Sequence, residues 1–216
     1  MARVKAAGCI VMGSATIVRE ATWLEENGAD VIIAQGAEAG GHRGMFLTEN
    51  IANQPGIFAL LPQVVDAVRL PVVAAGGIAD GRGIAAPFAL GAAGVQIGTA
   101  YLRCPESKVI APARAALAES LDDSTVITNV MTGRPARGVV NRVMREIGPV
   151  SPHAPAFPHA ATRLAPLKAA AEKLGKVDFT NLWAGQAVRL GRELPAAELT
   201  RALAGAALAR LSQLAG

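Results

Sequence analysis

The sequence predicts an α/β fold built on a parallel sheet. Over the first two thirds of the chain, short apolar runs that end in glycine alternate with longer helical segments. The run at 31–35 (VIIAQ) is almost uniformly apolar, as expected of a strand covered on both faces. Hydrophobic residues make up 51% of the chain but aromatic residues only 4%, which favours close packing of helices on strands over a sandwich.

The order of the elements indicates consecutive βα units. Asn27 and Gly28 resemble a helix C-cap, and Ser14 and Thr16 are candidate N-caps for the same helix. Pro62 favours a start of the next helix near that residue, since proline suits the first helical position. We expect strands at residues 8–13, 31–35, 72–75 and 94–99, and helices at residues 16–27, 57–69 and 82–90.

The pattern changes after Thr99. Alanine-rich or amphipathic segments predict helices at 107–120, 160–174 and 195–214. Residues 124–147 mix β-branched residues with a Gly- and Arg-rich stretch and receive no element. Four prolines interrupt any element in 149–158. We therefore expect the C-terminal part to be helical or irregular.

Composition excludes several classes of protein. The 21 basic and 17 acidic residues are dispersed, which disfavours nucleic-acid binding. No apolar run approaches the roughly 20 residues of a membrane helix, and residues 1–18 are interpreted as containing a buried strand rather than a signal peptide. Two widely separated cysteines predict reduced thiols in a cytoplasmic protein. No metal is expected, because these residues lack ligand spacing: Cys9, His42, Cys104, His153 and His159.

A glycine-rich loop carries a candidate catalytic histidine. The loop QGAEAGGHRG at 35–44 begins at the carboxyl end of the predicted strand, where parallel α/β folds bind ligands. His42 could act there as a general base, or it could be a solvated loop histidine. Arg43 would disfavour the protonated imidazole and Glu38 would favour it, so the sequence leaves the sign of the pKa shift open.

Two further strand ends predict a phosphate site. Gly76 and Gly77 follow one strand, and the stretch Gln96–Thr99 ends the next. Backbone N–H groups of adjacent glycine-rich loops, together with a helix N-terminus, can bind phosphate, although turn glycines are common in such folds. The chain lacks a G-x-G-x-x-G fingerprint after its first strand and lacks a Walker loop. Trp183 is interpreted as a packing anchor, and His153 and His159 as solvated surface residues.

With these residues placed, the chain resembles the nitronate monooxygenase family, formerly 2-nitropropane dioxygenases, which are FMN enzymes on a TIM-barrel scaffold. The matching segments are AQGAEAGGHRG at 34–44, LPVVAAGGIADGRGIAAPFALGAAGVQIGT at 70–99, TGRPARG at 132–138 and LWAGQ at 182–186. The resemblance implies oxidation of alkyl nitronates or nitroalkanes by FMN and oxygen, giving a carbonyl compound and nitrite. It also implies that His42 is the catalytic base or acid. The FMN-binding positions it implies are Gln35, Gly40, Gly76, Gly77, Gln96, Ile97, Gly98 and Thr99.

The chain has fewer βα units than the complete barrel that this resemblance implies. A full barrel has eight units and only four are found, which look like the last four because the phosphate loops follow the final two. We expect a partial FMN-binding barrel over 1–106 and a helical or irregular segment packed on it over 107–216. A half barrel leaves two open sheet edges, so a homo-oligomer or a complementing chain is expected to cover them. An FMN-dependent enoyl-acyl-carrier-protein reductase and a flavin-binding remnant with little activity remain the alternatives.

Overall fold

The computed structural model describes all of residues 1–216 and divides them into two compact units. The first unit contains residues 1–39, 44–97 and 200–216, and the second contains residues 40–43 and 98–199. The chain thus leaves the first unit for only four residues, 40–43, before it returns. The domain division expected between residues 106 and 107 stays a prediction, because compactness alone does not define a domain.

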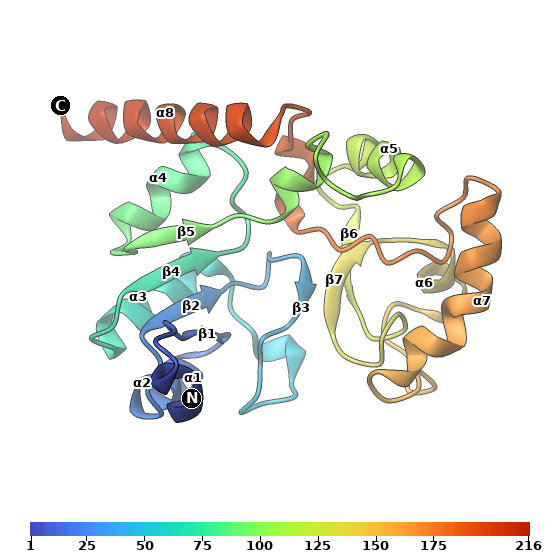
Figure 1. Cartoon of the computed structure of the whole chain (residues 1–216), viewed down its shortest axis with the longest axis horizontal. Helices are drawn as coiled ribbons and strands as arrows, with labels where there is room; N and C mark the ends of the chain where they lie inside the picture. Colours follow the sequence, from blue (N-terminus) through green and yellow to red (C-terminus); the bar gives the residue numbers. More distant parts are fainter. The chain divides into compact units, whose positions relative to one another are not determined.

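The first unit is built on a four-stranded parallel sheet with the order β1-β2-β4-β5 (Figure 1). The sheet is open and forms no closed barrel. Its strands are β1 Met12–Ala15, β2 Val31–Gln35, β4 Val72–Ala75 and β5 Gly94–Gln96. The predicted α/β class with parallel neighbouring strands is therefore confirmed.

The two central strands lie where the sequence predicts them. β2 and β4 coincide with the expected ranges 31–35 and 72–75. Ile32 and Ala34 of β2 and Ala74 of β4 are completely buried. Continuous apolar runs are typical of parallel strands covered on both faces, which explains why these two elements were readable without a structure.

Helices connect the strands and cover the sheet. Helix α2 packs on β1 and β2, α3 packs on β2 and β4, and α4 packs on β5 (Figure 1). Their bounds are α2 Val18–Glu26, α3 Ile57–Ala67 and α4 Gly81–Ala89. Asn27 is the C-cap of α2 and Gly28 follows with a φ of +88°, as expected. The proposed N-caps are wrong, since Ile17 takes that position and the side chain of Glu20 receives the N–H and hydroxyl of Thr16.

The expected start of α3 near Pro62 is also wrong. The helix begins at Ile57 and contains Pro62 in its interior. Both carboxylate oxygens of Glu38 lie 2.9 Å from the backbone nitrogen of Ile57 and cap the helix there. Glu38 is remote in sequence from this helix, so no local pattern could have indicated the true start.

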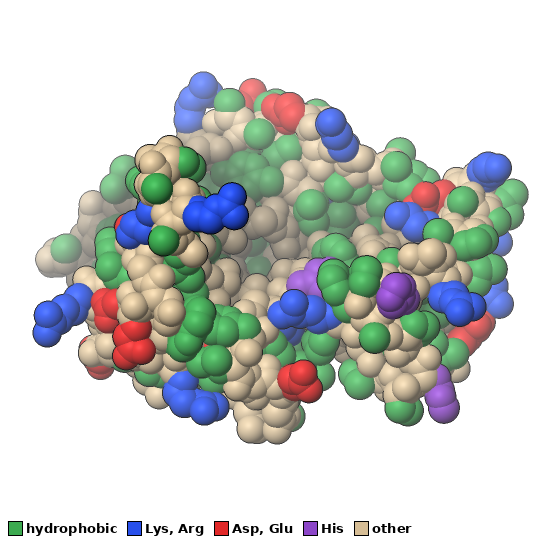
Figure 2. Space-filling view, turned by 60° about the horizontal axis from the view of Figure 1, so that its bottom comes forward, with side chains coloured by type: hydrophobic (Ala, Val, Ile, Leu, Met, Phe, Trp, Pro, Cys, Tyr) green, Lys and Arg blue, Asp and Glu red, His purple; other side chains and the backbone are tan.

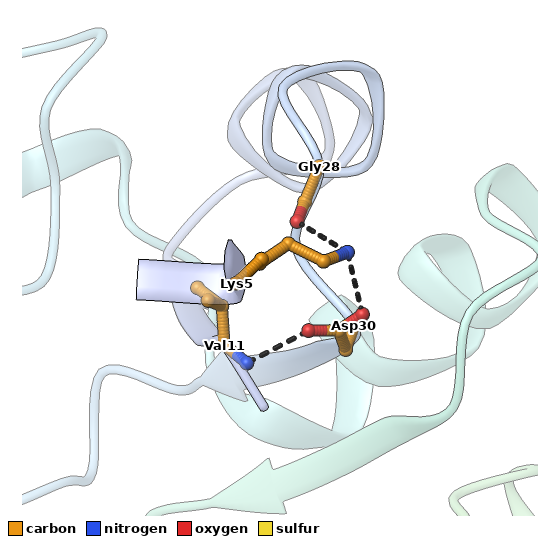
Figure 3. Close-up of polar contacts among 4 residues, drawn as sticks. All are labelled: Lys5, Val11, Gly28 and Asp30. Carbon is orange, nitrogen blue, oxygen red and sulfur yellow. Dashed lines mark hydrogen bonds and ion pairs between the residues drawn. The ribbon is translucent and has the colours of Figure 1, made fainter. Parts of the chain in front are cut away.

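The first strand begins later than predicted and is not buried at its start. Residues 8–11 precede β1, and Ile10 and Met12 are 75% and 50% exposed. The approach to β1 is held by Asp30, whose Oδ2 accepts a hydrogen bond of 2.8 Å from the Val11 N–H (Figure 3). Lys5 of α1 (Ala2–Ala6) reaches Oδ1 of the same carboxylate at 2.7 Å and the carbonyl of Gly28 at 3.2 Å. β1 is an edge strand of the sheet, and these polar contacts hold its start.

The fourth predicted strand is shorter than expected. β5 ends at Gln96, and Gly98 adopts φ −112° and ψ −65°. This conformation starts the 3-10 helix η2 (Thr99–Arg103), which belongs to the second unit together with Gly98. The glycine-rich stretch 96–99 thus forms a strand end and a turn.

The second unit contains an antiparallel sheet that the sequence did not predict. Its strand order is β3-β7-β6, with β3 Gly41–His42, β6 Thr125–Thr128 and β7 Ala136–Val139. These strands lie in the segment expected to be irregular and in the histidine loop. They are short, and β3 is joined to β7 only by pairing across a long stretch of chain, so they carry little local signal.

Helices complete the second unit around two apolar clusters. One cluster includes Ala113, Leu117, Leu182 and Val188, and the other includes Met131 and Met144. The remaining elements are α5 Ala111–Glu119, α6 Arg142–Ile147, α7 His159–Lys173 and η3 Gln186–Leu190. The C-terminal helix α8 spans Ala196–Ala215, and η1 (Ile51–Asn53) is a 3-10 turn of the first unit. The expected helices at 107–120, 160–174 and 195–214 are confirmed with shifted ends, and 149–158 holds no helix or strand.

Candidate functional site

The backbone around His42 is held by strand pairing within the second unit. His42 pairs with Ala136 and Gly41 with Arg137 across the antiparallel β3–β7 ladder. The next residue, Arg43, donates its backbone N–H to the carbonyl of Pro135 at 2.9 Å. The candidate catalytic histidine therefore lies on an ordered strand rather than on a solvated loop tip.

The imidazole of His42 is half-buried among a hydroxyl and two aromatic rings. Its Nε2 lies 2.9 Å from Oγ1 of Thr132. The ring of Phe157 meets it edge-on with centroids 5.7 Å apart, and the Trp183 ring lies at 5.4 Å with an interplanar angle of 56°. Aromatic neighbours remove water from the ring and restrict its rotation, which suits a group that must present one nitrogen in a defined direction.

The structure gives a sign to the pKa shift that the sequence left open. Burial lowers the pKa of His42, and the positive charges of Arg134 and Arg43 lower it further. Glu38, the acidic neighbour in sequence, uses its carboxylate to cap α3 in the first unit. With its pKa below the ordinary value of about 6.5, His42 is neutral at pH 7 and can accept a proton.

Gln35 lies at the carboxyl end of β2, and its side chain binds the last residue of the 35–44 loop. Its Oε1 accepts the backbone N–H of Gly44 at 2.7 Å, and its carbonyl accepts from Nε2 of Gln54 at 2.9 Å. Just beyond this loop, Oε1 of Glu20 accepts the N–H groups of Phe46 and Leu47. The chain therefore leaves and re-enters the first unit between two anchored ends.

Three of the candidate binding segments lie side by side at one edge of the parallel sheet. The register pairs Gln35 with Ala75 and Ala75 with Gln96. Gly76 and Gly77 therefore follow β4 at the same level at which Ile97 follows β5. This arrangement belongs to the first unit and brings together the two loops expected to bind phosphate.

The loop geometry at this edge fits a phosphate group. Gly76 and Gly77 adopt φ values of +111° and +70°, which only glycine takes at little cost. The backbone N–H groups of Gly76, Gly77 and Ile97 donate to no carbonyl or side chain. N–H groups left without acceptors at adjacent strand ends are the donors that a phosphate requires.

The N-terminus of α4 contributes less to such a site than expected. Its cap is Asp80, whose Oδ1 accepts the Gly83 N–H at 2.9 Å and whose Oδ2 pairs with the Arg82 guanidinium. The carboxylate already occupies the position that an anion would take in the first turn. The glycine loops therefore remain the candidate phosphate donors within the first unit.

The remaining candidates belong to the second unit and converge on Gly185 of the LWAGQ segment. Oγ1 of Thr99 accepts the Gly185 N–H at 2.9 Å. A Cβ added to Gly40 would lie 2.6 Å from the same nitrogen. Gly40 is thus required by close backbone packing, whatever it contributes to a ligand. At Gly98, by contrast, an added Cβ would meet nothing within 4 Å, so its backbone faces open space.

The sequence missed the residues that surround His42. Thr132 and Phe157 are 90 and 115 positions away in the chain, and only the matched segment TGRPARG hinted at the first. Trp183 does pack, as expected, against the backbone of Gly138, but it also contacts the histidine. His153 and His159 are exposed, as predicted.

The rest of the surface and the side-chain clusters add no second chemical signal. On the face shown in Figure 2, basic and acidic side chains are scattered singly or in pairs, without a large patch of either charge. No group of three or more His, Cys, Asp or Glu residues is placed to hold a metal ion. None of the helices combines the length and the apolar character needed to cross a membrane.

Comparisons with known proteins agree with the resemblance in the motifs. The family model described as nitronate monooxygenase matches residues 1–205. A probable nitronate monooxygenase of Staphylococcus aureus (strain Newman) is 42% identical over 197 residues, which are 91% of this chain and 56% of that protein. The chain therefore spans about half the length of the curated relatives it matches.

Two solved structures are similar over almost the whole chain. A nitroalkane oxidase from Streptomyces ansochromogenes has a TM-score of 0.91 and 44% identity, covering 99% of this chain and 61% of that one. FabK from Thermotoga maritima has a TM-score of 0.83 and 31% identity, covering 99% of this chain and 66% of that one. At these identities, the two proteins are similar to this chain in sequence as well as in fold.

Proposed function

Because the chain belongs to the nitronate monooxygenase family, we propose that it takes part in the FMN-dependent oxidation of alkyl nitronates and nitroalkanes by oxygen, with a carbonyl compound and nitrite as products. The observation that carries the proposal is His42, a histidine kept neutral beside Thr132 and two aromatic rings. The similarity to a nitroalkane oxidase supports the choice of substrate class.

FMN fits the donors that the chain offers. The N–H groups of Gly76, Gly77 and Ile97 would hold its phosphate, since they have no other acceptor. The other implied positions are Gln35, Gly40, Gln96, Gly98 and Thr99. When bound, the flavin supplies the electron transfer that no side chain of this protein can perform.

The part played by the protein is to orient the substrate and handle its proton. A neutral nitroalkane must lose its α-proton before it is oxidised, and neutral His42 is the group able to accept it. Phe157 and Trp183 flank the imidazole and restrict its orientation, which favours direct transfer of the proton between substrate and ring. A nitronate has already lost this proton and needs no base.

We further propose that β1, β2, β4 and β5 are the last four strands of a TIM-type barrel. The phosphate donors follow the final two of these strands, as is frequent in such barrels. The open edge at β1, with exposed Ile10 and Met12, would then be covered by further barrel strands or by a second copy of the chain.

We place the protein in the cytoplasm on the basis of its two free thiols.

The test is nitrite release from a neutral nitroalkane and from its preformed nitronate, using protein whose flavin absorbance survives desalting. His42→Ala is expected to lower turnover of the neutral substrate by about 10²–10⁴-fold and to affect the nitronate much less. His153→Ala, which removes an exposed histidine of the same unit, is the matched control. With the neutral substrate, the rate should rise with pH through the lowered pKa of His42 and then level off, because only the neutral imidazole accepts the proton.

Other results would reassign the activity. Protein that neither carries nor binds FMN would contradict the proposal. Oxidation of reduced nicotinamide that depends on an enoyl thioester, without nitrite from a nitronate, would indicate an enoyl-acyl-carrier-protein reductase instead. FMN binding without either reaction would indicate a flavin-binding remnant. An unchanged His42→Ala enzyme would refute the assignment of the base.

A further inference from the structure

The segment TGRPARG at 132–138 holds the candidate base from two directions. Its backbone pairs with the histidine strand, since Ala136 is the ladder partner of His42 and Pro135 accepts the N–H of Arg43. Its first residue, Thr132, reaches the imidazole through the 2.9 Å contact to Nε2. One short segment therefore sets both the position of the histidine backbone and the environment of its ring.

The hydroxyl of Thr132 has one proton to donate, and a second acceptor competes for it. Its Oγ1 lies 3.2 Å from the carbonyl oxygen of Arg134, in a geometry in which the hydroxyl donates. The N–H of Arg134 approaches the same oxygen at 3.4 Å. The hydroxyl proton is therefore donated to the Arg134 carbonyl, within the turn 132–134. This turn includes Gly133 with a φ of +88°.

If the hydroxyl proton points at the Arg134 carbonyl, the contact to His42 can form only when the imidazole nitrogen is the donor. A neutral imidazole carries one N–H and one lone pair, and the hydrogen bond made at one nitrogen selects the tautomer. The Nε2–H form donates to a lone pair of Thr132, whereas the other tautomer would place two lone pairs against each other.

We propose that Thr132 is a positioning residue that keeps the neutral His42 protonated at Nε2, so that Nδ1 is the atom that accepts the substrate proton. In the proposed step, the α-carbon–hydrogen bond of a neutral nitroalkane breaks, its electron pair stays on the substrate as the nitronate, and the proton forms a bond to Nδ1. The resulting imidazolium keeps its Nε2–H bond to Thr132, so the ring does not need to turn during the transfer.

The charges around the ring agree with this arrangement. The positive charges of Arg134 and Arg43 act on His42 and disfavour a second proton on its ring. In the proposed arrangement a neutral hydroxyl selects the tautomer, whereas a carboxylate orients the histidine in many catalytic triads. The neutral form is favoured because burial and these two positive charges lower the pKa of the imidazole.

The location of the proton can be tested without substrate or flavin turnover. In the ¹⁵N-labelled protein, correlations from the ring carbon protons to the ring nitrogens distinguish the two neutral tautomers. Only three histidines are present, and the His42→Ala spectrum identifies the signals of His42 by difference. Above its pKa, His42 should exist as one tautomer, protonated at Nε2. Protonation at Nδ1 would overturn the proposal even in a fully active enzyme.

Three variants test the role of the hydroxyl. Thr132→Val should convert the single tautomer into a mixture, and Thr132→Ser should restore it. Thr128→Val is the matched control: it removes another buried hydroxyl from the same unit, which contacts the N–H of Val130, and should leave the His42 signals unchanged. A single Nε2–H tautomer in Thr132→Val would also overturn the proposal. If Thr132→Val does not fold, the wild-type tautomer still decides it.

The kinetic part of the proposal rests on the proposed function and has a separate readout. Thr132→Val should lower kcat for a neutral nitroalkane by about tenfold and leave kcat for the preformed nitronate within about twofold, because only the neutral substrate needs the base. Equal losses on both substrates would refute the positioning role. If neither substrate releases nitrite in the wild type, the proposed function fails, while the NMR experiment still decides the tautomer.

Discussion

The buried carboxylate of Glu20 provides the sharpest test of how the histidine loop is anchored. Its Oε2 accepts the N–H and the hydroxyl of Thr16, each at 2.7 Å, and its Oε1 accepts the N–H groups of Phe46 and Leu47 at 2.6 and 3.0 Å. The side chain is completely buried. Glu20→Gln keeps the shape of the side chain but replaces one acceptor oxygen with a donor.

The cost of Glu20→Gln follows from these four bonds. The amide is accommodated best when its NH₂ group faces Thr16, because the hydroxyl can turn and accept. One buried backbone N–H is then left without an acceptor, which costs about 1–3 kcal/mol, and the two bonds from Phe46 and Leu47 lose the charged partner, about 1 kcal/mol each. The free energy of unfolding should therefore fall by about 3–5 kcal/mol at pH 7.

The same carboxylate makes a pH-dependent contribution to stability. Burial raises the pKa of Glu20, but the bonds from Leu47, Phe46 and Thr16 outweigh burial and leave the pKa below its ordinary value. The stabilisation is complete above the unfolded value of about 4.3 and is lost as the pH falls through the lower folded pKa. The difference between wild type and Glu20→Gln should be largest at neutral pH and shrink in acid.

Urea denaturation followed by circular dichroism at several pH values measures both effects. Glu26→Gln is the matched control, since Glu26 lies on the same helix and is exposed, and it should change stability by no more than about 0.5 kcal/mol. A loss below about 1 kcal/mol for Glu20→Gln, or a loss that does not change with pH, would refute the reasoning.

Three further substitutions test packing and capping. Gly40→Ala should destabilise the protein by about 1–3 kcal/mol in a denaturation experiment, since its Cβ would overlap backbone atoms, whereas Gly205→Ala, on α8 with open space around it, should stabilise by about 0.5–1 kcal/mol. Equal effects of the two changes would contradict the packing argument. Glu38→Ala should cost about 0.5–2 kcal/mol in the same measurement by uncapping the N–H of Ile57, and a neutral result would mean that the cap contributes nothing.

Local sequence was sufficient for the elements whose identity depends on their own residues. The central strands at 31–35 and 72–75 could be predicted because continuous apolar runs suit a sheet covered on both faces. The turn at Gly76 and Gly77 could be predicted because positive φ values are nearly restricted to glycine, and both residues adopt them. Their role in binding phosphate stays a prediction. His42 could be singled out because its loop starts at a strand end.

Tertiary structure decided everything that depends on partners distant in the chain. The carboxylate of Glu38 caps α3 at Ile57, and part of the histidine loop is a strand because it pairs with β7. The sign of the His42 pKa shift depended on burial and on Arg134, a residue 92 positions away, and its hydrogen bond to Thr132 has no local signature. The sequence alone therefore determined which residues could do the chemistry. Only the tertiary structure determined the direction of the pKa shift and the contacts of the candidate base, because both depend on side chains that folding brings together.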